Sequence, residues 1–286
     1  LFLIIPSLIN KAYIFDLKES QSFVRFFAQH GIESYLMDWG TPSALEQYFH
    51  IEDYILKRLI PALSHIYQQE ERPVHILGYC MGAPLALALT QFCPSQIASL
   101  SLLAPPWDFH SPDTPFRPLI KQLHPTFTEI LKQKQLLEID LIQSLFNLLD
   151  PFGVHEKFER FADLDQTSLE AENFVALEDW LNDGVPLTQG VAIDCLNDWY
   201  LNNLTALEQW KIAGKTISAR KINHPCHIFI AKNDRIVGNL SSRSLSEQIS
   251  GAKTHLIDSG HIGMMIGKSA HKTLYEPLLN WLKRLP

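Results

Sequence analysis

The sequence predicts an α/β fold with a mostly parallel central sheet, because short apolar runs alternate along the chain with segments of helical periodicity. We expect strands at Leu1–Ile5, Ser34–Asp38, Val74–Tyr79, Ala98–Ala104, His227–Ala231 and Lys253–Ile257. The helices between and after them are expected at Ser20–His30, Ser43–Gln69, Ala83–Phe92, Ser241–Ile249 and Ala270–Lys283. Strands that alternate with helices return in the same direction, so helices cover both faces of the sheet.

A helical insertion interrupts this alternation between Ala104 and His227, where prolines and helical periodicity occur without a convincing strand. We therefore expect a core formed by residues 1–104 and 221–286, with a cap formed by residues 105–220. The cap helices are expected at Phe127–Leu137, Asp140–Leu149, Ser168–Trp180 and Val191–Leu204. Most of the large cap aromatics should attach the cap to the core, and the others should line an apolar pocket; they include Phe146, Phe174, Trp180, Trp199 and Trp210.

Composition narrows the function classes. The 286 residues are 46% hydrophobic, which is enough for one large α/β domain with an insertion. The formal net charge is −7 and no run of five like charges occurs, so neither a nucleic-acid surface nor a polybasic membrane patch is expected. The four cysteines lie far apart without a Cys-x-x-Cys pair, which is typical of a reduced cytoplasmic protein rather than a disulfide scaffold or a zinc site.

The apolar opening of the chain predicts a buried strand. Leu1–Ile5 is broken by Pro6 and lacks a basic flank and a cleavage site, so we expect neither a signal peptide nor a transmembrane segment. Because the chain begins on this strand without a methionine, we expect further residues upstream of Leu1.

A possible nucleophile follows the third expected strand. There the chain reads Gly78-Tyr79-Cys80-Met81-Gly82 and continues directly into an alanine- and leucine-rich helix. This pattern predicts the nucleophile elbow of an α/β-hydrolase fold, with cysteine in the place usually taken by serine. A thiolate at a helix N-terminus beside an imidazole is a strong nucleophile, and Cys80 is expected in such a position. The other three cysteines, Cys93, Cys195 and Cys226, lack this setting and are expected in the core.

The base and the acid should follow the last two strands, because this fold presents nucleophile, acid and base in that order. His261 lies in a glycine-flanked loop after the last expected strand, and Asp234 follows the strand before it. Asp234 would orient the imidazole and stabilise its protonated form, with Asp258 and Asp108 as the alternatives. An Asn-Asp turn without a catalytic role also remains open for Asp234. The N–H of Met81 is expected to bind the oxyanion, together with an N–H from the loop 6–14.

These segments together resemble the catalytic domain of polyhydroxyalkanoate synthases, which polymerise 3-hydroxyacyl groups from coenzyme A thioesters. The motifs that carry the resemblance are Pro6–Leu17, Asp38-Trp39, Gly78–Gly82, Asp234–Val237 and Ser259–Ile262. The resemblance implies a triad of Cys80, Asp234 and His261, a second oxyanion donor at the N–H of Ile14, and a supporting acid at Asp16. It implies no metal and no cofactor.

The same resemblance implies a cytoplasmic enzyme that acts on 3-hydroxyacyl-coenzyme A or on a polyester, forms a homodimer through its cap and associates with polymer granules. The chain departs from the family pattern at Ala83, Arg235 and Gly238 and lacks the N-terminal region of full-length synthases. Three functions therefore stand: an acyltransferase of the synthase type, a hydrolase (a thioesterase or a depolymerase-like esterase), and a catalytically silent granule-binding homologue.

Overall fold

The central sheet is parallel, as the sequence predicts. The structure, a computed structural model, describes residues 1–149 and 153–285. These residues include a six-stranded sheet in the order β10-β9-β4-β3-β1-β2, and every neighbouring pair in it is parallel. The strands are β1 (Phe2–Ile5), β2 (Ser34–Leu36), β3 (Val74–Tyr79), β4 (Ile97–Leu103), β9 (Cys226–Ala231) and β10 (Lys253–Ile257). The predicted α/β architecture with a parallel central sheet is confirmed.

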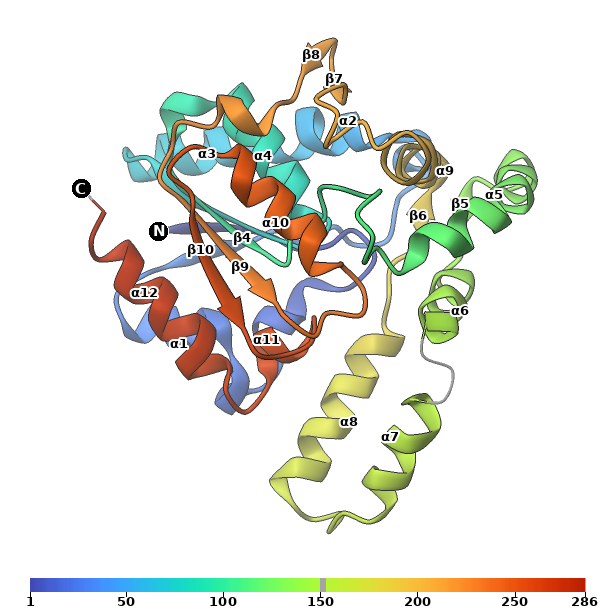
Figure 1. The fold of residues 1–286 in the computed structure, drawn as a ribbon. Helices are drawn as coiled ribbons and strands as arrows, with labels where there is room; N and C mark the ends of the chain where they lie inside the picture. The colour runs from blue at the N-terminus through green and yellow to red at the C-terminus, as the bar shows by residue number, and fades with distance from the viewer. Residues whose placement is uncertain (150–152, 286) are drawn as a thin grey trace.

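Helices cover both faces of this sheet (Figure 1). Helices α1 (Phe23–Gln29), α11 (Gly263–Ile266) and α12 (Glu276–Leu282) cover one face. The other face is covered by α2 (Ile51–Tyr54), α3 (Ile60–Glu70), α4 (Gly82–Phe92) and α10 (Asn239–Gln248).

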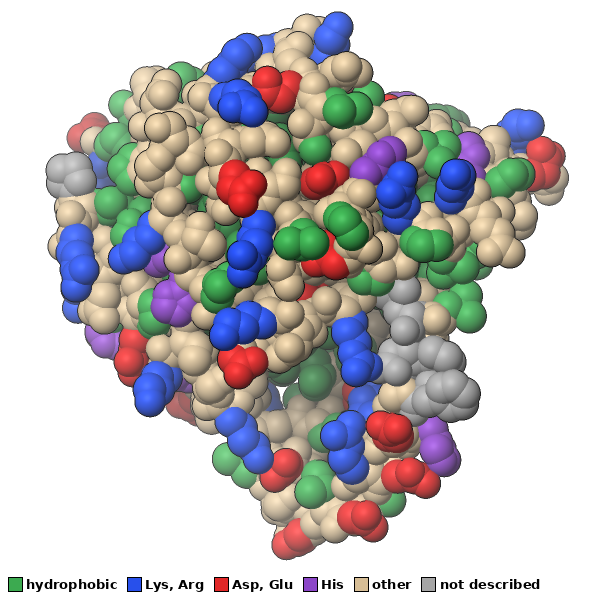
Figure 2. All heavy atoms as spheres, in the orientation of Figure 1, with side chains coloured by type: hydrophobic (Ala, Val, Ile, Leu, Met, Phe, Trp, Pro, Cys, Tyr) green, Lys and Arg blue, Asp and Glu red, His purple; other side chains and the backbone are tan. Residues whose placement is uncertain are grey.

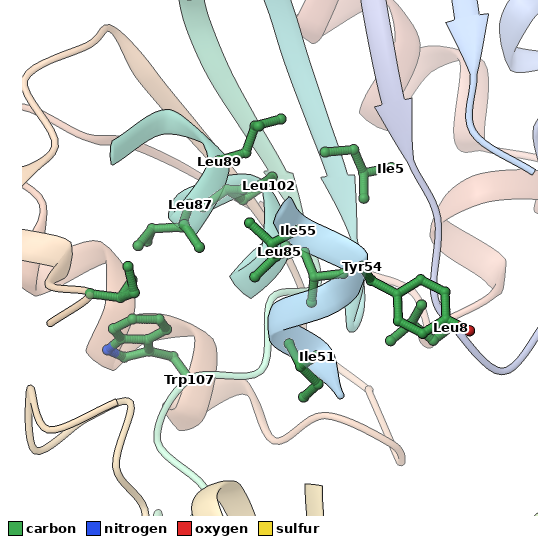
Figure 3. Close-up of a cluster of buried hydrophobic side chains, with 14 of the residues drawn as sticks. Ile5, Leu8, Ile51, Tyr54, Ile55, Leu85, Leu87, Leu89, Leu102 and Trp107 are labelled. Carbon is green, nitrogen blue, oxygen red and sulfur yellow. The ribbon is translucent and has the colours of Figure 1, made fainter. Parts of the chain in front are cut away.

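The alternation of side chains along β1 divides the hydrophobic core in two. Leu3 and Ile5 belong to the cluster under α3 and α4, whereas Phe2 and Ile4 belong to the cluster under α1 and α12. Figure 3 shows the first cluster, in which Ile5, Leu85 and Leu102 come from β1, α4 and β4. A strand buried on both faces is apolar throughout, which explains why β1 is an unbroken hydrophobic run.

One long predicted helix is only partly correct. The sequence predicts a helix from Ser43 to Gln69, but regular helix begins at Ile51 and continues through a π-helical turn at Ile55–Leu59 into α3. His50 caps this helix: its backbone N–H donates to the carboxylate of Asp53, and its ring contacts Asp194 at 2.8 Å. Since Asp194 belongs to the expected cap, the start of this helix depends on a residue far away in the sequence.

The inserted segment is mainly helical. Its helices are α5 (Phe116–Gln133), α6 (Ile139–Leu149), α7 (Gly153–Ala162), α8 (Leu169–Asn182) and α9 (Gln189–Asp194), followed by a π-helical turn at Cys195–Leu201. Helices α7 and α8 project from the body of the molecule as a hairpin, which forms the lower lobe in Figure 2. No helix in residues 1–149 and 153–285 has the length and apolar character needed to span a bilayer.

The expectation of no strand in the insertion is wrong. Its described residues include four two-residue strands, β5 (Leu136–Leu137), β6 (Leu187–Thr188), β7 (Lys211–Ile212) and β8 (Lys215–Thr216). They form two small antiparallel pairs, β5 with β6 and β7 with β8. Strands of two residues are too short to show an alternating pattern, so periodicity does not detect them. The boundaries 1–104, 105–220 and 221–286 stay a prediction, although the described residues between Leu103 and Cys226 add no strand to the main sheet.

The first cap helix begins earlier than predicted. The sequence predicts Phe127–Leu137, whereas α5 runs from Phe116 to Gln133 with Pro125 inside it. An internal proline costs a helix about 3 kcal/mol. The buried face of Phe116, Ile120, Phe127 and Leu131 offsets that cost, because each fully buried side chain contributes about 2 kcal/mol.

The turn between β3 and α4 requires its glycines. Cys80 has a φ of 53°, a left-handed conformation that is strained for any residue with a Cβ. A Cβ built on Gly82 would lie 2.0 Å from the carbonyl oxygen of Ile5, and one on Gly78 would lie 2.7 Å from Cα of Ala83. The two glycines therefore allow β1, β3 and α4 to approach closely enough to hold the turn in this conformation.

We expect the change Gly82→Ala to lower the free energy of unfolding by ~2–4 kcal/mol, because the backbone of β1 or α4 must shift to relieve the contact with Ile5. Urea unfolding followed by circular dichroism measures this. Gly263→Ala is the control, since its Cβ would meet its nearest neighbour at 3.9 Å. Equal stability of the two variants would contradict the close approach at the turn.

A buried histidine in β9 makes the stability depend on pH. Burial lowers the pKa of His227 to about 3, aided by Lys253 and His255, and neither ring nitrogen has a hydrogen-bond partner. Since the folded pKa lies below 6.5, the folded state excludes a proton that the unfolded state binds. The resulting stability is present above pH 6.5 and is lost as the pH falls towards about 3.

Between pH 7.5 and pH 5, the free energy of unfolding of the native protein should fall by about 1 kcal/mol more than that of the His227→Leu variant. This value is reduced for solvent screening. Urea unfolding of both proteins at the two pH values measures the difference. His75, whose pKa burial lowers to about 4, is unchanged in both proteins and cancels in the comparison. Identical pH dependence of the two proteins would show that His227 is not held neutral in the fold.

Candidate active site

Cys80 lies at the strained turn, where β3 ends and α4 begins. Its backbone N–H donates to the carbonyl of Leu103 at 2.9 Å, and its carbonyl accepts from the N–H of Ala83 at 2.9 Å. The residue is 7% exposed, so the thiol lies in the interior next to the N-terminus of α4.

The structure brings His261 and Asp234 together, as the sequence predicts. Nδ1 of His261 lies 2.7 Å from Oδ2 of Asp234, and both side chains are almost fully buried. The other carboxylate oxygen of Asp234 accepts hydrogen bonds from the N–H groups of Ile236 and Val237, each at 2.8 Å. These three contacts leave the carboxylate no freedom to turn away from the imidazole.

Two backbone hydrogen bonds join the loops that carry the acid and the base. The N–H of Lys232 donates to the carbonyl of Ile257 at 2.8 Å, and the N–H of Asn233 donates to the carbonyl of Ser259 at 3.0 Å. They continue the pairing of β9 with β10 beyond the ends of the strands. The separation of Asp234 and His261 is therefore set by the sheet itself.

The imidazole of His261 is held in its protonated form. Burial alone would lower the pKa of His261, but the negative charges of Asp234 and Cys80 and the hydrogen bond with Asp234 outweigh burial. Together they raise the pKa to about 10. Cys80 and His261 line the same cavity, so the thiol and the imidazole–carboxylate pair face one space.

The alternative acids make other contacts. Asp258 accepts a hydrogen bond from the side chain of Asn233 at 3.0 Å. Asp108 accepts from the side chain of Asn203 at 2.8 Å and from the N–H of His110 at 2.9 Å. Neither carboxylate contacts His261 in these hydrogen bonds, so Asp234 remains the candidate acid.

Tyr79 is a site residue that the sequence analysis did not identify. Its ring stacks on His261 with centroids 5.2 Å apart and an interplanar angle of 27°. Its hydroxyl donates to the backbone carbonyl of His261 at 3.3 Å, and burial raises the pKa of this phenol, which keeps it a donor. Tyr79 immediately precedes Cys80, so one residue links the elbow to the base; its position inside the Gly78–Gly82 motif was the available signal.

The predicted oxyanion donors lie beside the nucleophile. Met81 follows Cys80 and is the N-terminal cap residue of α4. Ile14 belongs to a 3₁₀-helical turn, Ala12–Phe15, and lines the same cavity as Cys80 and His261. The loop before this turn is held by the expected cap, since the indole N–H of Trp180 donates to the carbonyl of Lys11 at 2.8 Å.

Asp16 does not join the site. Its carboxylate accepts a hydrogen bond from Nε of Arg25 at 2.8 Å and is partly exposed. It is absent from the residues that line the two cavities at Cys80. Asp16 was expected to support the triad, but Arg25 of α1 holds its carboxylate at the surface, away from Cys80 and His261.

A polar cavity of about 180 Å³ opens at Cys80 and His261. Its far wall is formed by α6, by the middle of α7, by the C-terminal end of α8 and by the loop after β1. The polar and charged residues of that wall include Ser7, Asn10, Lys11, Gln143, Asn147, Lys157, Glu178 and Asn182. Lys157 and Glu178 form an ion pair at 2.8 Å within it. We call this space the polar cavity.

A second space of about 120 Å³ also reaches Cys80, and we call it the apolar cavity. The five residues that it shares with the polar cavity are Ile9, Cys80, Ile142, Phe146 and Ile236. Its other walls come mainly from α5, α6, α9 and the π-helical turn after α9. The sulfur of Cys80 thus lies where two cavities meet, one of which has charged and amide side chains in its wall.

The cap aromatics divide between packing and lining. Phe146 and Trp180 line the polar cavity, and Trp199 lines the apolar cavity. Trp210 is buried against Trp199, and Phe174 stacks on Phe161. The four cysteines are free, and Cys195, predicted as a core residue, is also part of the apolar cavity wall. Within residues 1–149 and 153–285, no group of three or more His, Cys, Asp or Glu residues is arranged to hold a metal ion.

Comparisons with known proteins agree with this geometry. The family model described as the alpha/beta hydrolase family matches residues 7–272. Among solved structures, a monoacylglycerol lipase from Paleococcus ferrophilus superposes with a TM-score of 0.62 at 15% identity, covering 98% of this chain and 93% of the lipase. A thermophilic esterase from Thermogutta terrifontis gives a TM-score of 0.58 at 12% identity, covering 99% of this chain and 89% of the esterase. At these identities the structures show the fold alone.

Curated relatives cover nearly the whole chain. A poly(3-hydroxyalkanoate) polymerase subunit PhaC from Haloarcula marismortui is 26% identical over 98% of this chain and 60% of its own length. The subunit of that name from Haloferax mediterranei is 23% identical over 98% of this chain and 58% of its own length. A third, from Synechocystis, is 24% identical over 98% of this chain and 76% of its own length.

The chain thus spans about 60% of the length of the first two relatives. The resemblance predicted from the sequence motifs is confirmed over 98% of the chain. The chain belongs to the alpha/beta hydrolase family, as a member similar to the poly(3-hydroxyalkanoate) polymerase subunits.

Proposed function

We propose that this protein is an acyltransferase of the polyhydroxyalkanoate synthase type, which takes 3-hydroxyacyl groups from coenzyme A thioesters through Cys80. The observation that carries the proposal is the placement of Cys80 at the strained turn, on the wall of a cavity that it shares with His261 of the His261–Asp234 pair. A cysteine elbow suits thioester substrates, because transfer of an acyl group from one thiol to another is nearly isoenergetic. The acyl group then remains activated for an alcohol acceptor.

In the first half-reaction the thiolate of Cys80 attacks the thioester carbonyl and forms a new carbon–sulfur bond. The bond to the sulfur of coenzyme A breaks, and the departing thiolate takes the proton of the His261 imidazolium. The raised pKa of His261 means that this proton is in place before the substrate arrives. The N–H groups of Met81 and Ile14 stabilise the oxyanion of the tetrahedral intermediate.

In the second half-reaction neutral His261 accepts a proton from the hydroxyl of the acceptor. The alkoxide oxygen attacks the acyl carbon, and Cys80 leaves as a thiolate, which restores the starting ion pair. Asp234 keeps Nδ1 protonated, so Nε2 is the nitrogen that exchanges protons in both halves. No metal or cofactor takes part in this scheme.

The polar cavity supplies an entry for the coenzyme A portion. The whole chain carries a net charge of −7, so an anionic substrate needs cations placed locally. Lys11 and Lys157 lie in the wall of this cavity, each paired with a carboxylate, Asp183 and Glu178, and amide side chains beside them provide donors for the pantetheine arm. Cytoplasmic location, a homodimer formed through the cap and granule association belong to the same proposal. The helices α6, α7 and α8 expose large apolar side chains, among them Leu148, Phe158 and Val175.

The test is incubation of the protein with 3-hydroxybutyryl- and 3-hydroxyoctanoyl-coenzyme A, with thiol release followed by a colorimetric reagent and the products identified by mass. We expect ester-linked oligomers and free coenzyme A. Cys80→Ser and His261→Ala should each lower the rate of thiol release by about 10²–10⁴-fold, because each removes a group required in both half-reactions. Cys93→Ser is the matched control, since this thiol lies outside both cavities, and it should retain the native rate.

Three results would overturn the proposal in different ways. Free 3-hydroxy acid as the sole product would identify a thioesterase, and full thiol release by Cys80→Ser would exclude cysteine as the nucleophile. Binding of the thioester without any turnover would identify a catalytically silent homologue.

A further inference from the structure

The reaction scheme above places no part of the substrate in the apolar cavity, although Cys80 forms part of the wall of this cavity. It is lined by Ile9, Cys80, Met81, Pro106, Phe109, Phe116, Ile120, Leu137, Ile142, Leu145, Phe146, Leu187, Ala192, Cys195, Leu196, Trp199, Tyr200, Ile236 and Val237. An acyl group attached to the sulfur of Cys80 therefore has a non-polar space directly beside it.

The chemistry of this wall selects an uncharged, saturated occupant. Among the residues that the structure describes, its lining includes no Asp, Glu, Lys, Arg or His side chain. Burial raises the pKa of the Cys195 thiol and of the Tyr200 phenol, so both stay neutral. A charged group placed here would lose its hydration without compensation, which excludes the phosphates of coenzyme A from this cavity.

A polyester segment also fits this wall poorly. Each repeat of such a chain carries an ester group, and buried ester oxygens need donors. The indole N–H of Trp199 is buried here without a partner and the neutral phenol of Tyr200 can also donate, but two such donors do not serve a series of ester groups. A saturated alkyl chain needs no donor and gains free energy from each carbon that leaves water.

The volume of the cavity sets the length of that alkyl chain. A cavity of about 150 Å³ lined by Leu, Ile and Phe side chains accommodates benzene, which has six carbon atoms. By proportion, a cavity of about 120 Å³ holds about five carbons. The walls are firm, because Phe116, Ile120 and Ala192 are at most 5% exposed and pack into the hydrophobic core.

We propose that the apolar cavity binds the alkyl side chain of a medium-chain 3-hydroxyacyl group, with about five carbons beyond the hydroxyl-bearing carbon. The preferred substrate is then of the 3-hydroxyoctanoyl class. This inference rests on the proposed function and adds the acyl chain length to it. The carbonyl group lies at the sulfur of Cys80, the alkyl chain enters the apolar cavity, and the coenzyme A portion leaves through the polar cavity.

The experiment compares kcat/KM for 3-hydroxybutyryl-, 3-hydroxyhexanoyl-, 3-hydroxyoctanoyl- and 3-hydroxydodecanoyl-coenzyme A. We expect the 3-hydroxyoctanoyl thioester to exceed the 3-hydroxybutyryl thioester by about tenfold or more, since a single methylene in an apolar pocket changes kcat/KM by about that factor. The 3-hydroxydodecanoyl thioester should be slower again, because its chain exceeds the cavity.

Two variants should move the preference in opposite directions. Ala192→Leu places an isopropyl group in the cavity and should shift the maximum to the 3-hydroxybutyryl or 3-hydroxyhexanoyl thioester. Leu196→Ala enlarges the cavity and should shift it towards the 3-hydroxydodecanoyl thioester. Leu181→Ala is the matched control for the second variant, because Leu181 lines the polar cavity alone and its truncation should leave the order of preference unchanged.

A second measurement needs no turnover. Alkyl methanethiosulfonates of increasing chain length modify thiols by forming a mixed disulfide and releasing methanesulfinate. The rate at Cys80, divided by the rate at Cys93 in the same protein, should rise to a maximum near the pentyl reagent and move to shorter reagents in Ala192→Leu. This ratio corrects for the intrinsic reactivity of each reagent.

The two measurements separate the inference from the function on which it rests. Turnover that is fastest with 3-hydroxybutyryl-coenzyme A and keeps its order in both cavity variants would overturn the inference and leave the function standing. Absence of turnover with every thioester would overturn the function, and the labelling profile would then decide the inference. A flat profile would refute an alkyl-binding cavity, and a maximum near pentyl would support it.

Discussion

The site depends on one buried contact, the 2.7 Å interaction between Asp234 and His261. A carboxylate and an imidazolium removed from water lose hydration, and a buried charge of this kind persists only when it is paired and hydrogen-bonded. Here the carboxylate accepts two backbone N–H groups as well as the imidazole, and the imidazole stacks on Tyr79. Each partner therefore stabilises the charge of the other, and Cys80 interacts with a ring that already carries a proton.

The backbone holds these side chains in place at a local cost. The left-handed conformation of Cys80 is strained, and the close approach of β1 to α4 at Gly82 stabilises it. The pairing of β9 with β10 sets the distance from Asp234 to His261. Cys80, Asp234 and His261 thus follow separate strands of one sheet, which is rigid because both of its faces are buried.

Sequence patterns predicted the parts of the site that depend on local chemistry. The elbow could be recognised because its glycines and the following helix lie within a few residues of Cys80. Asp234 and His261 could be predicted from their positions after consecutive strands. Asp16 could not, because its contact with Arg25 depends on how the turn Ala12–Phe15 lies against α1. The start of α2 was missed for the same kind of reason, since it depends on Asp194. The two cavities were also out of reach, because their walls combine residues from segments far apart in the chain.

The central claim is that Asp234 and Cys80 keep the ring of His261 protonated in the folded protein. The most direct measurement is an NMR titration of the His261 ring in protein labelled with ¹⁵N at histidine, compared with the Asp234→Asn and Cys80→Ala variants. The account predicts that the native ring stays protonated beyond neutral pH, towards a pKa of about 10, and that each variant loses its proton at a lower pH. A native ring that is neutral at pH 7, or one whose titration is the same in all three proteins, would contradict it.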